Sequence, residues 1–424
     1  MKVLVIGSGA REHALVRSIA ADPVVDAVMA APGNPGIEAL AQCVPVDPMD
    51  GAAVAALALA HGVDLVVVGP EAPLVAGVAD AVRAAGIPAF GPSARAARLE
   101  GSKAFAKEIM AAAGVPTAMA RVCSTLDQVA DALETFGPPH VVKDDGLAAG
   151  KGVVVTDDRA AALAHAAGCL DRPGGRVVVE QFLDGPEVSL FAVTDGTTVI
   201  PLTPAQDFKR VGDGDAGPNT GGMGAYSPLP WAPDDLTDEV VKRVAQPVVD
   251  ELARRGTPFA GLLYCGLAMT AAGMRVIEFN ARFGDPETQV VLARLRTPLA
   301  GLLHAAATGT LEAAPALRWS SSAAVTVVIA AADYPGTPRT GDPITGLDAA
   351  GAVEGAWVLH AGTRRDEQGR VVSAGGRVLS VVGTGPDLAA ARAVAYRAVD
   401  LIGLTGSHHR HDIAERAATP DPGS

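Results

Sequence analysis

The sequence is poor in aromatic residues and in positive charge. Aromatic residues make up 4% of the chain although 49% is hydrophobic, so any core has to be built mainly from Val, Leu, Ile and Ala. The 34 Lys and Arg residues against 47 Asp and Glu residues give a formal net charge of -13. This acidic balance argues against a general binder of nucleic acid or of membrane surfaces, although local basic pockets are compatible with it.

Cysteine is also scarce, and long apolar runs are missing. Cys43, Cys123, Cys169 and Cys265 lie far apart and form no C-x-x-C pair, which favours reduced thiols in the cytoplasm over a disulfide framework or a zinc site. No uncharged apolar stretch reaches the roughly 18 residues of a membrane span, and the first apolar run is too short for a signal peptide. We therefore expect a cytoplasmic protein without a membrane partner.

The first 100 residues alternate short apolar runs with Ala-rich helical stretches, a pattern typical of a parallel, doubly wound sheet. The predicted strands are 3–6, 25–30, 65–68 and 89–90. Further on, Ser102 is expected to cap a helix over 102–113. The remaining predicted strands are 141–143, 153–156, 177–181, 324–331, 356–359 and 376–382, with helices near 159–170, 235–255, 288–308 and 387–402.

Two glycine-containing segments are candidates for phosphate binding. Gly7-Ser8-Gly9-Ala10-Arg11-Glu12 joins a predicted strand to a helix, where amides can hold an anion, but Glu12 stands at the third glycine of a dinucleotide fingerprint. An ordinary turn is an equally open interpretation. The small-residue loop between Lys143 and Val153 leads into a strand, unlike a Walker A loop, and we favour a phosphate-binding hairpin there over a plain one.

Alternation along residues 276–283 predicts a metal site. Residues i and i+2 of a strand face the same side, so Glu278 and Asn280 present two oxygen ligands together while Phe279 faces the core. Mg2+ binds a few hard oxygens together with phosphate oxygens and water. Arg282 falls next on this face if the strand continues, and a guanidinium there can stabilise a transferring phosphoryl group. A buried Glu–Arg pair is the less favoured interpretation.

Three further polar segments leave alternatives open. Acidic residues flank the turn at 181–187, which taken alone is better interpreted as solvated. Asp207, Lys209 and Arg210 combine an acid with two bases, and the glycine-rich loop over 213–224 either binds a ligand through its backbone or is mobile. His408, His409 and His411 favour a surface cluster or a phosphate contact over a metal site.

Taken in order, these segments resemble the phosphoribosylamine–glycine ligase family of the ATP-grasp superfamily. The resemblance extends over nearly the whole chain. It is carried by the opening at 7–15 and by GPEAPL (69–74), LEGSKAFAK (99–107), DGLAAGKGVVV (145–155), GPNTGGMGAYSP (217–228), EFNARFGDPETQ (278–289), HAGT (360–363), GGRVL (375–379) and RHDI (410–413). The chain departs from the family pattern at Ala10, Asp144, Gln181 and Ala332-Asp333, and Phe208 stands where His is usual.

The resemblance implies an α/β ATP-grasp fold. It places a Rossmann-like domain over 1–101, a catalytic domain over 102–320 with a mobile lid over 118–187, a mixed α/β domain over 321–416, and a disordered tail over 417–424. ATP is expected between the lid and the central sheet, together with Mg2+ or Mn2+. The substrates implied are ATP, glycine and 5-phosphoribosylamine, joined through glycyl phosphate during purine synthesis by a monomer or weak oligomer.

The resemblance also implies roles for individual residues. Those for ATP are Lys103, Lys143, Gly150, Lys151, Gly152, Glu180 for adenine and Glu187 for ribose. The implied metal ligands are Glu278 and Asn280. The implied substrate-binding residues are Gly9, Arg11, Glu12, Asn219, Gly221 and Gly222, and the catalytic candidates are Arg282, Asp285 and Lys209.

Three other classes compete with this interpretation. The nearest is another ATP-grasp enzyme, such as a biotin-dependent carboxylase or a different carboxylate–amine ligase. A dinucleotide oxidoreductase is disfavoured by the missing third glycine and by the missing acid after the second strand. A nucleotide-binding regulator without catalytic activity is disfavoured by the presence of Glu278, Asn280 and the lysines.

Overall fold

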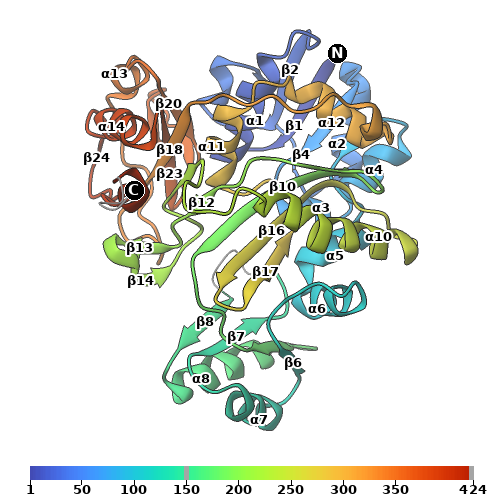
Figure 1. Cartoon of the computed structure of the whole chain (residues 1–424). Helices are drawn as coiled ribbons and strands as arrows, with labels where there is room; N and C mark the ends of the chain where they lie inside the picture. Colours follow the sequence, from blue (N-terminus) through green and yellow to red (C-terminus); the bar gives the residue numbers. More distant parts are fainter. Residues whose placement is uncertain (148–151, 420–424) are drawn as a thin grey trace.

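The computed structural model describes residues 1–147 and 152–419 (Figure 1). Its N-terminal sheet has the order β3-β2-β1-β4-β5, and all neighbouring strands are parallel, as predicted. The order reverses between β1 and β4, so the loops after these two strands meet at one edge, where doubly wound sheets bind ligands. The strands are β1 (Lys2–Gly7), β2 (Ala27–Pro32), β3 (Gln42–Cys43), β4 (Leu65–Val68) and β5 (Ala89–Phe90).

Helix caps in the N-terminal half follow from the sequence. Asp50 accepts a hydrogen bond from the amide of Ala53 and so caps α2 (Gly51–His61). Ser102 accepts one from the amide of Phe105, which confirms the predicted cap of α6 (Lys103–Ala112). These caps satisfy amides that the first helical turn leaves without a partner. The other helices here are α1 (Ala10–Ala20), α3 (Glu71–Val75), α4 (Val78–Ala84) and α5 (Ala94–Gly101).

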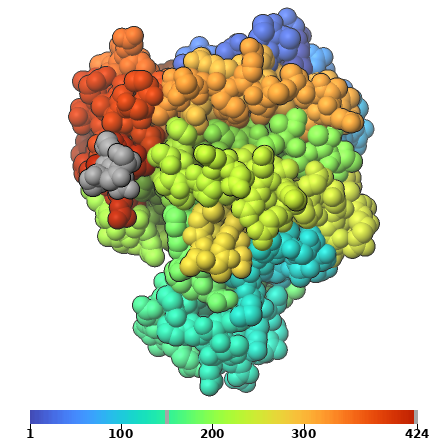
Figure 2. Space-filling view, viewed as in Figure 1, coloured from blue at the N-terminus to red at the C-terminus, as the bar shows by residue number. Residues whose placement is uncertain are grey.

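Residues 120–147 and 152–180 form a lobe with its own small core, which projects from the rest of the molecule (Figure 2). Its antiparallel sheet has the order β6-β9-β7-β8, and α7 (Leu126–Phe136) and α8 (Arg159–Leu170) complete it. The pairing of β7 with β8 confirms that the loop after Lys143 connects two strands of a hairpin. The strands are β6 (Ala120–Cys123), β7 (His140–Asp144), β8 (Val153–Thr156) and β9 (Val177–Glu180). Movement of this lobe as a lid stays a prediction.

The central sheet contains the longest strand of the described residues and lies between the lobe and the N-terminal sheet (Figure 1). Its order is β11-β10-β16-β17, all antiparallel. The two helices expected around it are each interrupted. Region 235–255 consists of α9 (Leu236–Val240), a π-helical turn and α10 (Gln246–Arg254), and region 288–308 of α11 (Glu287–Arg294) and α12 (Leu299–Thr308). The strands are β10 (Glu187–Asp195), β11 (Val199–Pro201), β16 (Ala260–Thr270) and β17 (Gly273–Asn280).

The C-terminal sheet recruits two strands from the middle of the chain. Its order is β12-β15-β18-β23-β20, and α14 (Leu388–Val399) packs on it. A domain boundary at 320 therefore separates strands that are hydrogen-bonded to one another, since β15 pairs with β18. The strands are β12 (Gln206–Asp207), β15 (Gly224–Ser227), β18 (Ala323–Ala330), β20 (Ala356–His360) and β23 (Arg377–Gly385).

The prediction of a disordered tail over 417–424 is wrong for its first residues. Ala417 and Ala418 are the last residues of α15 (Glu415–Ala418) and are partly buried against the core. Residues 420–424 lie outside the described part of the chain. Among the described residues, no helix is both long enough and apolar enough to cross a membrane.

A buried histidine pair joins α1 to β20. The backbone N–H of His360 donates to Nδ1 of His13 at 2.9 Å, and Asn34 donates to the carbonyl oxygens of Ser8 and His360. Burial lowers the pKa of His13 to about 3 and that of His360 to about 4. Both rings are therefore neutral near pH 7, as Nδ1 of His13 must be to accept a hydrogen bond.

Acid is expected to destabilise this contact. Histidines of the unfolded chain titrate near pH 6.5, so between that value and about pH 4 the unfolded state binds more protons than the folded one. Stability is then lost as the pH falls through this window. We expect His13→Gln to reduce the slope of unfolding free energy against pH by about 1.4 kcal/mol per pH unit, the contribution of one proton. Thermal unfolding from pH 4 to 7 measures it.

The matched control is His61→Gln, because His61 lies in the last turn of α2. This variant should leave the loss of unfolding free energy at acidic pH as in the parent protein. An unchanged loss in His13→Gln would show that the buried pair does not titrate as described.

Candidate functional site

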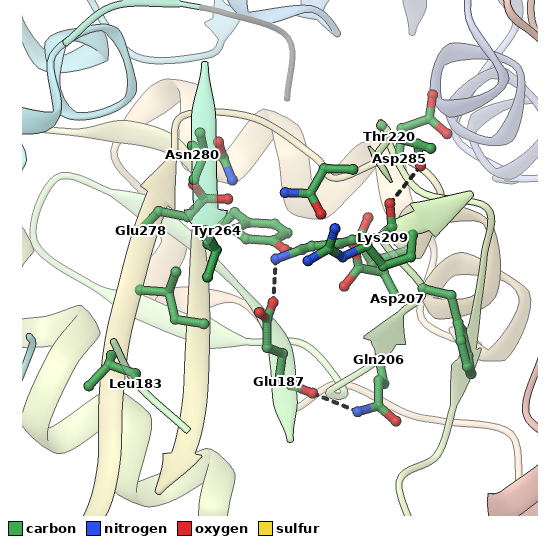
Figure 3. A pocket seen from close by; sticks show the side chains of 18 of the residues that line it. Leu183, Glu187, Gln206, Asp207, Lys209, Thr220, Tyr264, Glu278, Asn280 and Asp285 are labelled. Carbon is green, nitrogen blue, oxygen red and sulfur yellow. Dashed lines mark hydrogen bonds and ion pairs between the residues drawn. The ribbon is translucent and has the colours of Figure 1, made fainter. Parts of the chain in front are cut away.

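A large cavity of about 1350 Å3 lies between the projecting lobe, the central sheet and the C-terminal segments. Figure 3 shows that polar side chains from β10, β12, β16 and β17 point into it from different sides. Most of the residues selected from the sequence line this cavity. They are Arg11, Lys103, Lys143, Gly152, Glu180, Glu187, Lys209, Asn219, Gly221, Glu278, Asn280, Arg282 and Asp285.

The predicted alternation along β17 is confirmed. Phe279 is buried in the core, whereas Glu278 and Asn280 are partly exposed and border the cavity at the end of the strand. Burial alone would raise the pKa of Glu278, but the surrounding cations Lys209, Lys143 and Lys103 outweigh it and lower the pKa below its ordinary value. The carboxylate is therefore ionised at neutral pH.

This donor set fits a hard cation that also binds a phosphorylated substrate. Glu278 and Asn280 offer only oxygen donors from the protein side, which suits Mg2+ or Mn2+ and not a softer metal. Among the described residues, no cluster of three or more His, Cys, Asp and Glu is placed to hold a metal by itself. Phosphate oxygens and water would have to complete the coordination, as is usual for Mg2+.

Lysines on the lobe side share one buried carboxylate. Oε2 of Glu180 lies 3.2 Å from Nζ of Lys107 and 3.1 Å from Nζ of Lys143. Lys143 also donates to the carbonyl oxygen of Ile277, and Lys103 to that of Gly146. The Glu180 side chain faces these lysines, so its contact with adenine stays a prediction, and one that would use peptide groups. Gly150 and Lys151 lie outside the described residues.

The opposite wall contains a group of ionisable side chains, of which Tyr264 and Glu287 are buried, whereas Lys209 and Glu187 are partly exposed. Lys209 forms an ion pair with Glu187, which occupies the carboxylate proposed for the ribose (Figure 3). Burial, with the neighbouring Glu287 and Glu187, raises the pKa of Asp207 to about 8 despite the opposing effect of Lys209. Tyr264 donates to Glu287 at 2.9 Å. Asp207 was noted in the sequence without a role, and Tyr264 was not selected because no motif indicates it.

Arg282 corrects one expectation. The strand ends at Asn280, so Arg282 does not continue its face. Its guanidinium instead bridges to the N-terminal domain, with Nε 3.1 Å from Glu71 and Nη2 2.9 Å from Glu100. The two carboxylates outweigh burial and raise the pKa of Arg282. Glu71 follows β4 at the switch point of the sheet, a position that could have marked it in advance.

The turn after β1 binds the carboxylate of Glu12, which belongs to the same segment. Oε2 of Glu12 accepts from the amide of Gly9 at 2.6 Å, and Oε1 accepts from Nε of Arg11 at 2.6 Å. A Cβ at Gly7, Gly9 or Gly69 would come within 3 Å of this side chain. Of the three residues selected here, only Arg11 lines the cavity. Phosphate binding at this turn stays a prediction, and it requires Gly9 and Arg11 to exchange partners.

The glycine-rich loop is fastened by an arginine that sequence patterns did not indicate. Nη1 of Arg377 donates to the carbonyl oxygens of Gly221 at 2.5 Å and Asp285 at 2.7 Å, and Nη2 lies 3.3 Å from the Asp285 carboxylate. Gly222 packs against Pro286, where a Cβ would lie 2.4 Å from Cδ of the proline. Arg377 therefore links this loop to the segment after β17.

Comparisons with known proteins agree over the whole chain. Three family models match it in order: Phosphoribosylglycinamide synthetase, N domain, at residues 1–100; its ATP-grasp (A) domain at 101–288; and its C domain at 324–416. The chain is 70% identical over 420 residues to phosphoribosylamine–glycine ligase of Streptomyces coelicolor, covering 99% of this chain and 100% of the relative. It is 60% identical over 423 residues to that of Mycobacterium tuberculosis, covering 99% of each.

Solved structures give the same result. The crystal structure of phosphoribosylamine–glycine ligase from Thermotoga maritima superposes with a TM-score of 0.84 at 31% identity, covering 98% of this chain and 100% of that one. A biotin carboxylase domain from Hydrogenobacter thermophilus superposes with a TM-score of 0.71 at 17% identity, covering 96% and 91%. At that identity, the second likeness shows the fold alone.

Gly222→Ala tests the packing of the glycine-rich loop. Its φ of +105° and the contact with Pro286 both oppose a side chain, so we expect loss of stability beyond the roughly 1–2 kcal/mol of left-handed strain and a fall in ATP turnover. Gly309→Ala is the control, because Gly309 has a φ of +73° and a Cβ added there would meet no atom within 4 Å. Thermal unfolding and ADP release measure both. Equal losses in the two variants would contradict the tight packing.

Proposed function

The chain belongs to the phosphoribosylglycinamide synthetase family, and from this premise we propose that it joins glycine to 5-phosphoribosylamine at the expense of ATP. The products are N1-(5-phosphoribosyl)glycinamide, ADP and phosphate, a step of purine synthesis. The observation that carries the proposal is the convergence of Glu278 and Asn280 with Lys103, Lys143 and Lys209 on one cavity. Two oxygen ligands and three cations are what a metal–triphosphate needs.

ATP is assigned to the space between the lobe and the central sheet. Lys103 and Lys143 border this space, and their charge suits the phosphates. Peptide groups next to Glu180 are assigned to the adenine edge. Glu187 is assigned to the ribose, a contact that requires it to share or release Lys209. Glu278 and Asn280 would hold Mg2+ or Mn2+, which when bound neutralises phosphate oxygens.

The reaction needs an activated carboxylate, because oxide is a poor leaving group. A carboxylate oxygen of glycine attacks the γ-phosphorus of ATP, the bond to the bridging oxygen breaks, and ADP leaves. The amine nitrogen of phosphoribosylamine then attacks the carbonyl carbon of glycyl phosphate. The tetrahedral intermediate expels phosphate and the nitrogen loses a proton, which leaves the amide.

In this account the protein contributes position and charge and supplies no nucleophile. Lys103, Lys143 and Lys209 neutralise charge that moves during phosphoryl transfer. Arg282 presents a guanidinium whose orientation is fixed by Glu71 and Glu100, and Asp285 is held by Arg377 beside it. Closure of the lobe would protect the acyl phosphate from water.

The second substrate is assigned to the N-terminal side of the cavity. Arg11 and Glu71 come there from the edge where the first sheet reverses, a usual place for ligands. Asn219 and Gly221 border the cavity from the glycine-rich loop. We propose that the protein works in the cytoplasm, in keeping with its four free thiols, and as a monomer or weak oligomer.

The test is ADP release by purified protein with Mg-ATP, adding glycine and freshly made phosphoribosylamine separately and together. The proposal requires both. ADP release that is indifferent to them would leave the fold unchanged but reject this substrate pair, and dependence on bicarbonate and biotin would favour a carboxylase instead.

Glu278→Gln probes the metal ligand with almost no change in volume. Loss of its charge should lower ADP release at least about 100-fold, equivalent to roughly 2.7 kcal/mol of activation free energy, and raise the Mg2+ concentration required. Glu134→Gln, on an exposed face of α7, is the control. Full turnover of folded Glu278→Gln at ordinary Mg2+ would refute the assignment.

A further inference from the structure

Arg410 is a buried arginine of the C-terminal segment that borders the cavity. Only 1% of its side chain is exposed. Nε and Nη2 bind the two carboxylate oxygens of Asp412 at 2.7 and 2.6 Å, and Nη1 binds Asp215 at 2.7 Å. Two carboxylates around one guanidinium are the usual means of keeping an arginine in the interior.

The remaining contacts of Arg410 lie on both sides of Lys209. Its guanidinium carbon stands 4.8 Å from the centre of the Phe208 ring, within the range of a cation–π contact. Its Nη1 also donates to the carbonyl oxygen of Arg210 at 3.2 Å. Arg410 thus touches the residue before and the residue after Lys209 without being a partner of Lys209 itself.

Outside its own hairpin, the Lys209 segment is held by the ion pair of Lys209 with Glu187, by packing of Phe208 against the core, and by contacts with the C-terminal segment. Phe208 and Lys209 exchange backbone hydrogen bonds with Thr220, Met223 and Gly224, all in the glycine-rich loop and its following strand. Asp215, the second carboxylate on Arg410, lies at the tip of the same hairpin. Arg410 therefore connects both the tip and the base of this hairpin to the C-terminal segment.

We propose that Arg410 is a positioning residue for the reaction, which acts through Phe208 and Arg210 to hold the amine of Lys209 against Glu187 in the cavity. This proposal rests on the proposed function, because that function assigns Lys209 to charge neutralisation during phosphoryl transfer. A lysine at 410 would keep the charge but lose the planar fork and the face that stacks on Phe208.

A neighbouring arginine supplies the control. Arg392 also fastens the C-terminal segment, through the carbonyl oxygens of His411 and Ile413, and stacks on Tyr396. Its hydrogen bonds and ion pairs within the described part of the chain all stay in the C-terminal segment, and it does not line the cavity. Arg392→Lys therefore weakens the same segment without touching the residues beside Lys209.

The experiment measures chemical accessibility of Lys209 and activity in parallel. Full-length protein is treated with trinitrobenzenesulfonate, and the labelling rate of Lys209 is followed by mass spectrometry with Lys103 as internal reference. We expect Arg410→Lys to raise Lys209 labelling several-fold relative to Lys103, and to lower kcat by up to about 100-fold, the loss that a misplacement of about 1 Å can cause. Arg392→Lys should change neither ratio.

Two further measurements keep the test decisive. Phe208→Leu keeps an apolar side chain and removes only the ring, so it should raise Lys209 labelling even if Arg410→Lys fails to fold. In a Lys209→Ala background, Arg410→Lys should cause no further loss of kcat. Unchanged Lys209 labelling in folded Arg410→Lys or Phe208→Leu, or equal effects of Arg392→Lys, would overturn the proposal.

Failure of the proposed function has a different signature. If the parent protein releases no ADP with glycine and phosphoribosylamine, the substrate assignment is wrong, while the labelling ratios still decide whether Arg410 positions Lys209.

Discussion

The Glu278 carboxylate lines the cavity and is kept ionised by the cations around it, and this charge arrangement is the centre of the site. An isolated carboxylate in the interior would take up a proton and lose its value as a metal ligand. Lys103, Lys143 and Lys209 keep it ionised, and each comes from a different segment. Lys143 and Lys209 are in turn paired with Glu180 and Glu187. The cavity is therefore a charge-balanced array that a metal–triphosphate can enter by exchanging partners.

Ion pairs and hydrogen bonds also link the domains. Arg282, two residues beyond the end of β17, is paired with Glu71 and Glu100 of the N-terminal half. Arg377 of the C-terminal sheet holds the glycine-rich loop and Asp285 together. The histidine pair between α1 and β20 closes the contact of the first and last sheets without charge. The end of β17 therefore lies close to contacts that join three parts of the chain.

Much of the fold and of the candidate site was predictable where a local rule applies. Strands 65–68, 89–90 and 153–156, the Ser102 cap and the facing of Glu278 and Asn280 follow from apolar patterning and alternation. The break between α11 and α12 near Pro298 could also have been predicted, because proline disrupts a helix. The partners of Arg282, the acid Glu12 closing its own turn, and the role of Arg377 depend on contacts between distant segments, which no local pattern encodes. Asp333 takes a φ of +69° in a stretch where the family usually has glycine.

Transfer of oxygen between the substrates tests the central claim most directly, because only a carboxylate attack on ATP moves an oxygen atom from glycine to phosphate. Glycine labelled with oxygen-18 in its carboxylate should yield inorganic phosphate that carries one labelled oxygen for each amide formed. Phosphate without label, formed together with the glycinamide product, would contradict an acyl phosphate intermediate and with it the role assigned to the charge array around Glu278.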